Sequence, residues 1–210
     1  MRERTTTAED LAHGASEAAA AATGAAVLLA GIGAVAVFSA TAPLDFESAV
    51  PPHFLRQATA LGLGAGLAWA ASRVPLRSWY RLAPVLWLVS VVLLIATALA
   101  GHTAGGAQRW LVIPGVGFAF QPAEFAKLAT VLAVAAWLSG RDGKAALTRQ
   151  GVFGALFLAA VPASLCISQP DLGNAVLLMG LTGLLLFVGG SPFRILIAPA
   201  AVGAAAIALY

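Results

Sequence analysis

Three charged residues stand close together in the sequence beside long apolar segments: Arg109, Glu124 and Lys127. A charge in or beside hydrocarbon is costly unless it is paired or hydrated, so each is a candidate functional residue. Two interpretations are open. The three can line a polar cavity that holds a phosphate-bearing lipid, with arginine supplying planar bidentate contacts. Alternatively, they can form a salt-bridge cluster that locks a loop against a helix bundle.

The residues around Glu124 predict the start of a helix. Gln121 and Pro122 open it, because proline in the first turn lacks only an N–H that would have no partner there. Glu124 then falls in the first turn, where a carboxylate is favoured by the helix dipole. Lys127 follows on the same face, three residues later, so we expect it to pair with Glu124.

A second polar element, Gln169-Pro170-Asp171-Leu172-Gly173, separates two later apolar segments. Asp171 is placed to cap the helix that follows, which aspartate does well. Whether Asp171 only caps this helix or also has a functional role stays open.

Other types of site have little support. The histidines (His13, His53 and His102) have no short ligand spacing, and no nucleotide-hydrolysis or hydrolase motif is present. Cys166 is the only cysteine, so the chain cannot form an internal disulfide, and we expect Cys166 to be a packing residue. The formal charge of +3 is too small to indicate nucleic-acid binding. Trp79, Tyr80 and Trp110 are expected to be interfacial anchors, and Trp110 can alternatively brace a sugar or lipid head.

These residues must be positioned by membrane helices. The chain is 60% hydrophobic and only 10% charged, whereas soluble domains carry about a quarter charged residues. We therefore predict an all-α integral membrane protein, a polytopic bundle with residues 1–18 as a cytoplasmic tail and residues 19–210 as the transmembrane domain. About seven segments are expected: Ala19–Ala40, Phe54–Ala71, Leu82–Ala100, Pro122–Ser139, Val152–Ser168, Leu172–Gly189 and Ile195–Tyr210.

The segment before Gln121 is apolar but is interrupted by Pro114, Gly115 and Gly117. This composition predicts a re-entrant or surface-lying loop rather than a spanning helix. The distribution of Lys and Arg predicts the orientation. Nine of the 12 fall in the tail and in the loops after the second, fourth and sixth segments. The N-terminus is therefore expected in the cytoplasm, with both polar motifs on the outer side.

The pattern Gly-Ala-x-Arg109-Trp110, followed by Gln121-Pro-Ala-Glu124-x-x-Lys127 and then Gln169-Pro-Asp-Leu-Gly173, resembles the SEDS family of bacterial cell-wall polymerases, the FtsW/RodA/SpoVE group. Ala123 stands where the family usually has serine. The polar tail, Phe38-Ser-Ala-Thr41 and Phe54-Leu-Arg-Gln57 favour the division branch, which is FtsW-like. The resemblance covers roughly residues 25–194.

This resemblance implies a peptidoglycan glycosyltransferase of the bacterial cytoplasmic membrane. It would polymerise lipid II, which is undecaprenyl-pyrophosphate-linked disaccharide-pentapeptide, with a divalent cation (Mg or Mn) as cofactor and a class B penicillin-binding protein as partner. Family members have about ten membrane segments and carry an essential Asp in an external loop after the seventh. We therefore expect this chain to be an N-terminal fragment without its own catalytic base, and inactive alone. A lipid II flippase and a non-enzymatic scaffold of the division machinery are the alternatives.

Overall fold

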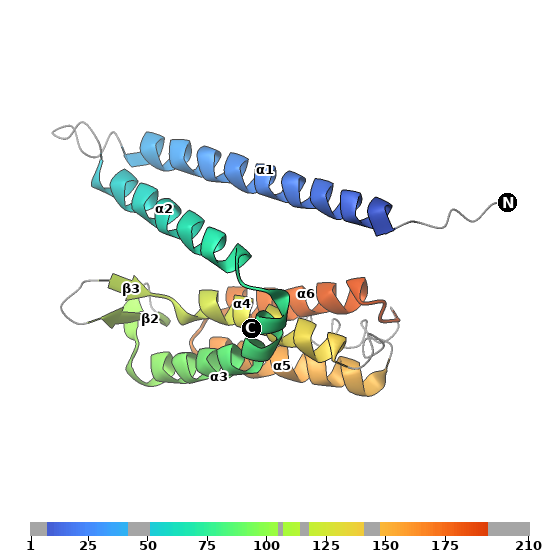
Figure 1. The fold of residues 1–210 in the computed structure, drawn as a ribbon. Helices are drawn as coiled ribbons and strands as arrows, with labels where there is room; N and C mark the ends of the chain where they lie inside the picture. The colour runs from blue at the N-terminus through green and yellow to red at the C-terminus, as the bar shows by residue number, and fades with distance from the viewer. Residues whose placement is uncertain (1–7, 42–50, 105–106, 114–117, 141–147, 193–210) are drawn as a thin grey trace. The chain divides into compact units, whose positions relative to one another are not determined.

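The structure is a computed structural model that describes residues 8–41, 51–104, 107–113, 118–140 and 148–192. The chain divides into two compact units, Met1–Val74 and Pro75–Tyr210, and each is described separately. Within the described residues the elements are helices, apart from three short strands (Figure 1). The predicted class, a polytopic helical membrane protein, is confirmed.

The first unit contains the helices α1 (Ala8–Thr41) and α2 (Pro52–Ser72). They contact each other, and the rings of Phe38 and Phe54 meet edge to face with centroids 5.3 Å apart. Pro51 precedes α2 and Pro52 opens it, as expected for a proline in the first turn. The helix α1 begins at Ala8, so part of the segment predicted to be a polar tail is helical.

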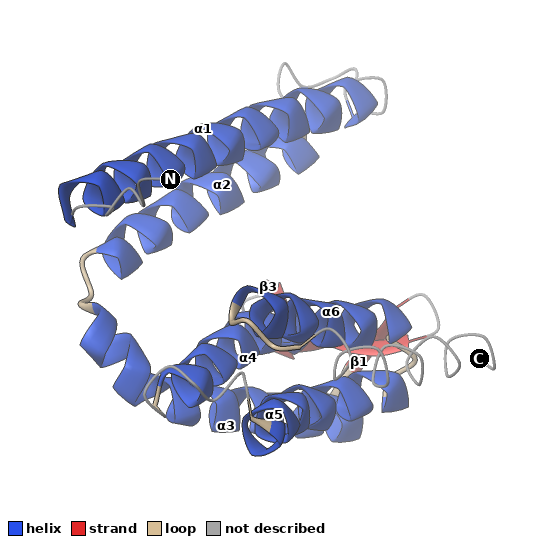
Figure 2. Ribbon diagram, turned by 90° about the vertical axis from the view of Figure 1, so that its right-hand side faces the viewer, coloured by secondary structure: helices blue, strands red, loops and turns tan. Residues whose placement is uncertain are grey.

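The second unit is a bundle of α3 (Leu76–Ala100), α4 (Pro122–Ser139), α5 (Arg149–Ser168) and α6 (Leu172–Val188) (Figure 2). Its core is built largely from small residues, including Ala126, Ala163 and Cys166, packed with Leu94 and Leu178. Small side chains allow membrane helices to approach closely. Close packing matters in a bilayer because lipid supplies no hydrophobic drive for helix association. The prediction that Cys166 is a packing residue is confirmed.

The segment between α3 and α4 differs from the predicted loop. It contains β1 (His102–Ala104), β2 (Ala107–Ile113) and β3 (Phe118–Phe120). The middle strand, β2, pairs antiparallel with both others, matching Thr103 to Gln108 and Val112 to Ala119. A Gly-Gly dipeptide stands between β1 and β2 in the sequence; such a pair favours a hairpin, which the prediction of a loop did not take into account. Residues 114–117, which carry the predicted breakers, lie outside the described residues.

The helix boundaries follow local capping signals. The helix α4 has the predicted bounds, whereas α3 begins six residues before the predicted Leu82, directly after Pro75. The helix α5 begins at Arg149 rather than Val152, because the Thr148 side chain accepts a hydrogen bond from the Gly151 N–H at 3.0 Å. Arg77 and Arg81 consequently lie in the first turns of α3 and not in a loop.

Four of the described helices have a segment long and apolar enough to cross a membrane. The segments are Ser16–Thr41, Leu76–Ala100, Pro122–Ser139 and Arg149–Ser168. The helix α6 is apolar but slightly shorter, and α2 does not meet the same measure of length and apolarity. The predicted seventh segment, Ile195–Tyr210, lies outside the described residues.

A hydrogen bond between helices repairs a proline defect inside α5. Pro162 has no N–H to donate to the carbonyl of Leu158, which would leave that oxygen without its helical partner. The indole N–H of Trp87, on α3, donates to this oxygen at 2.8 Å. The proline is therefore tolerated because a neighbouring helix supplies the donor, as is common in membrane bundles.

Candidate functional site: a salt bridge joining two polar motifs

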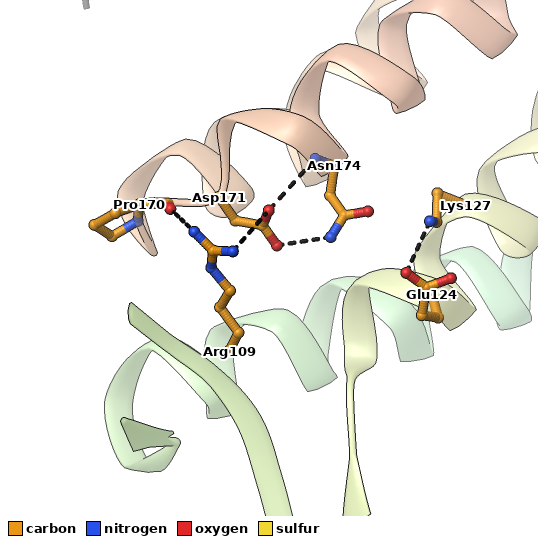
Figure 3. Close-up of polar contacts among 6 residues, drawn as sticks. All are labelled: Arg109, Glu124, Lys127, Pro170, Asp171 and Asn174. Carbon is orange, nitrogen blue, oxygen red and sulfur yellow. Dashed lines mark hydrogen bonds and ion pairs between the residues drawn. The ribbon is translucent and has the colours of Figure 1, made fainter. Parts of the chain in front are cut away.

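The two polar motifs meet through Arg109 (Figure 3). Arg109 lies on β2, and its Nη1 is 3.7 Å from Oδ1 of Asp171 at the start of α6. Its Nη2 donates a hydrogen bond to the carbonyl oxygen of Pro170. The Arg109 side chain is 36% exposed and that of Asp171 is 6% exposed. One guanidinium group thus holds both the carboxylate and the turn that carries it.

Asp171 caps α6, as the sequence predicted. Its Oδ1 accepts a hydrogen bond from the backbone N–H of Asn174 at 3.4 Å, and its Oδ2 accepts one from the side-chain Nδ2 of Asn174 at 2.7 Å. A buried carboxylate requires such partners, because desolvation of an isolated charge is very unfavourable. Asn174 was not selected from the sequence. It lies at the third position of the helix (N3), whose backbone N–H commonly donates to the N-cap side chain.

Glu124 and Lys127 form the predicted pair at the start of α4. The Nζ of Lys127 donates to Oε1 of Glu124 at 2.8 Å. The Glu124 side chain is 58% exposed and that of Lys127 is 19% exposed, so the carboxylate of this pair is more accessible than Asp171, whereas its cation is less accessible than Arg109. The ion-pair partner of Arg109 is Asp171 rather than Glu124 (Figure 3). The prediction that Arg109, Glu124 and Lys127 line one cavity stays a prediction.

Gln169 has a role that the sequence did not reveal. Its side chain is buried, and its Nε2 donates to the carbonyl oxygen of Leu94 on α3 at 2.8 Å. The turn between α5 and α6 is thereby fixed to α3. A second glutamine, Gln108 of β2, donates to the carbonyl oxygen of Gly101 at 2.7 Å. Both contacts connect residues that local periodicity cannot relate.

The other predicted site residues lie around these contacts. Gln121 is the N-cap of α4 but makes no capping hydrogen bond with its side chain, and Pro122 is buried in the first turn. Trp110 pairs with His102 across β1 and β2. Gly173 lies in the first turn of α6, and a Cβ atom there would meet no atom within 4 Å. Packing in the described structure therefore does not account for a glycine at position 173.

The geometry limits the chemistry available to each acid. Both oxygens of Asp171 are engaged by Arg109 and Asn174, which suits a positioning group better than a proton acceptor. Glu124 is more exposed, but one of its oxygens is held by Lys127. Among the residues that the structure describes, no group of three His, Cys, Asp or Glu side chains can hold a metal ion.

The comparisons with known proteins agree with the resemblance. A family described as "Cell cycle protein", FtsW/RodA/SpoVE, matches residues 20–210. A "Probable peptidoglycan glycosyltransferase FtsW" of Thiomicrospira cyclica is 37% identical over 142 residues, which are 68% of this chain and 36% of that protein. A protein of the same name from Halorhodospira halophila is 33% identical over 186 residues, covering 85% of this chain and 47% of that one.

Solved structures show the same fold. The crystal structure of the rod shape determining protein RodA of Thermus thermophilus matches with a TM-score of 0.66 and 29% identity, over 85% of this chain and 57% of that one. A chain from a structure described as "Structural coordination of polymerization and crosslinking by a peptidoglycan synthase complex" matches with a TM-score of 0.60 and 33% identity. That match covers 84% of this chain and 52% of the other.

The chain spans less than half the length of the FtsW relatives reported above. The family match nevertheless extends over nearly all of the chain, from the apolar part of α1 to residue 210. It includes the salt bridge between the two motifs and the pair at the start of α4. The chain belongs to the FtsW/RodA/SpoVE family.

Proposed function

We propose that this chain is part of a peptidoglycan glycosyltransferase that polymerises lipid II. In this proposal its residues form the scaffold on the side where the substrate binds. The observation that carries the proposal is the contact of Arg109 with Asp171, which joins the two motifs on which the family resemblance rests. The names of the FtsW relatives support the reaction class. Arg109 and Lys127 both lie at the end of the bundle where α4 and α6 begin, each paired with a carboxylate, so an anionic substrate would have to compete with Glu124 for Lys127.

The reaction joins two lipid-linked disaccharides. The C4 hydroxyl of one attacks the anomeric carbon of the other, a new C–O bond forms, and the bond to the lipid pyrophosphate breaks. A carboxylate takes the hydroxyl proton, which typically contributes about 10²–10⁴-fold to the rate. We assign this base to a residue other than Asp171, because the oxygens of Asp171 already have partners.

The residues of this chain have a positioning role in the proposal. Arg109 holds β2 against the start of α6, so loss of its charge would release the Pro170–Asp171 turn. Glu124 orients Lys127, whose ammonium is a point charge suited to a phosphate oxygen. No site in this chain is assigned to the divalent cation that the resemblance implies.

The test is a polymerisation assay on the purified full-length protein that contains this chain. Labelled lipid II is supplied in detergent, and glycan chains are separated by length. We expect polymer from the wild type and at least a tenfold loss with Lys127→Ala, which removes the proposed phosphate contact. Arg149→Ala is the matched control, since Arg149 is a cation at the far end of α5 from Gln169. Wild-type protein that makes no polymer would contradict the proposal.

The two alternatives give different results in related assays. A flippase would move lipid II across liposomes without forming polymer. A scaffold would restore division to cells even when its positioning residues are replaced.

One relative by structure comes from a peptidoglycan synthase complex, and we propose by analogy that the partner is a class B penicillin-binding protein. Co-purification of that protein with the full-length chain would test the partnership.

A further inference from the structure

A groove lies between the first turns of α3 and the last turns of α4. Its volume is about 380 Å³, within the range of roughly 300–1,000 Å³ typical of small-molecule sites. The groove is open to the surroundings, and its walls are almost entirely apolar. They are formed by Leu76, Trp79 and Tyr80 of α3 and by Leu132, Ala135 and Ala136 of α4.

The groove is remote from the salt-bridged motifs. The helix α4 has 18 residues and is therefore about 27 Å long, with Glu124 and Lys127 at one end and the groove at the other. The groove accordingly lies near the opposite membrane boundary. Trp79 and Tyr80 fit this depth, because their amphipathic rings favour the headgroup region of a bilayer.

The polar part of the groove is cationic. Arg77 contributes to its lining, and within the described structure no carboxylate pairs with it. The first turn of α3 contains no acidic residue that would offset this charge. Ser139, which also lines the groove, donates its hydroxyl to the carbonyl oxygen of Ala136 at 3.2 Å. Arg77 is therefore the one cationic side chain among the described residues that line this groove.

We propose that this groove binds an anionic phospholipid, with an acyl chain along its apolar walls and the phosphate held by Arg77. The shape of the site and its charge both favour this occupant. An acyl chain matches an open, apolar groove at the side of a membrane bundle. A basic residue near a membrane surface attracts anionic headgroups, whereas neutral lipids gain no such attraction. The site does not depend on the proposed glycosyltransferase activity.

Trp79 provides a reporter inside the groove. The full-length protein is placed in bilayers with increasing fractions of phosphatidylglycerol or phosphatidylcholine, each carrying brominated acyl chains that quench tryptophan on contact. The same measurement on Trp79→Phe is subtracted to isolate the Trp79 signal. We expect half-quenching at an approximately fivefold lower fraction of the anionic lipid, the effect of about one basic residue near a membrane surface.

Two substitutions assign this preference to the groove. Arg77→Gln should abolish the preference for the anionic lipid, whereas Arg81→Gln, one turn further along α3, should preserve it. Ala135→Phe fills the groove from an exposed position and should reduce quenching by both lipids. Equal quenching by the two lipids, or equal losses in Arg77→Gln and Arg81→Gln, would overturn the proposal. An absence of Trp79 quenching would also overturn it, by showing that protein fills the groove.

Discussion

Arg109 is held at two points, by the carboxylate of Asp171 and the carbonyl of Pro170, while its Nε is buried without a hydrogen-bond partner in the described structure. Removing Arg109 would leave the carboxylate of Asp171, which is mostly buried, with only Asn174 as its partner. An unpaired buried charge is more unfavourable than the loss of both partners. The two residues should therefore be energetically coupled.

We expect the losses in Arg109→Ala and Asp171→Ala to be non-additive, with a coupling of about 1–2 kcal/mol in the free energy of unfolding. The value is set below that of a fully buried pair because Arg109 is about a third exposed. Unfolding in mixed detergent micelles measures it. Arg109→Ala combined with Glu124→Ala is the control and should be additive within about 0.5 kcal/mol. Coupling in the control alone would favour the three-charge cluster predicted from the sequence.

Gln169 offers a second test at the residue scale. Gln169→Leu removes the hydrogen bond to Leu94 and should lower stability by about 1 kcal/mol. Gln169→Glu places a carboxylate oxygen against that carbonyl oxygen and should be more harmful at neutral pH. Burial raises the pKa of the introduced glutamate above its unfolded value of about 4.3. Its neutral form can donate to Leu94, so stability should recover as the pH falls towards that value.

The measurement is the melting temperature of the purified protein in detergent between pH 4 and pH 8. The Gln169→Leu variant is the matched control, because it has no titrating group at this position. The difference between the two variants should be largest at neutral pH and should shrink on acidification. A difference independent of pH would mean that residue 169 is hydrated rather than buried.

The sequence predicted the local contacts at this scale. The Glu124–Lys127 pair and the Asp171 cap follow from helix spacing and capping preference, and both are present. Neither the Arg109–Asp171 salt bridge nor the Gln169–Leu94 hydrogen bond was predictable from spacing. Their partners are 62 and 75 residues apart in the chain, and only the packing of the bundle brings them together.

At the scale of elements, the hydrogen bond that links α3 to α5 depends on the backbone N–H that Pro162 lacks. Trp87 replaces the N–H that Pro162 lacks, so its hydrogen bond to Leu158 matters most when proline is present. Trp87→Phe keeps most of the ring volume and should lower the free energy of unfolding by about 1 kcal/mol. In a Pro162→Ala background the loss should be smaller, because the backbone N–H that the substitution restores can itself donate to Leu158.

The same unfolding assay, applied to the two single variants and the double variant, completes this cycle. Equal losses from Trp87→Phe in both backgrounds would show that the indole contributes through its size alone. The sequence contained Pro162 and Trp87, but it did not indicate that they act on the same carbonyl. The bounds of α4 were predicted because a proline marks its start, whereas the strands between α3 and α4 were missed in favour of a loop.

At the scale of the whole molecule, the charge distribution and the contacts of the second unit both indicate that the two polar motifs lie at the same end of the bundle. The Arg109–Asp171 contact places the segment before α4 and the turn before α6 at the same end of the bundle. This agrees with the expectation that both motifs lie on one side of the membrane. Counting Lys and Arg predicts that this side is the outer one, with the N-terminus in the cytoplasm.

This orientation gives the last prediction. In a full-length variant with Cys166 replaced by alanine, a single cysteine at Ala104 should react in intact cells with a thiol reagent that cannot cross the membrane. A cysteine at Gly143, in the segment after α4, should react only after permeabilisation. The reason is that Arg141, Lys144 and Arg149 surround Gly143 in the sequence, and basic loops are retained in the cytoplasm. The opposite labelling would place both motifs inside the cell, where an external polymer could not be assembled, and would contradict the proposed function as well as the orientation.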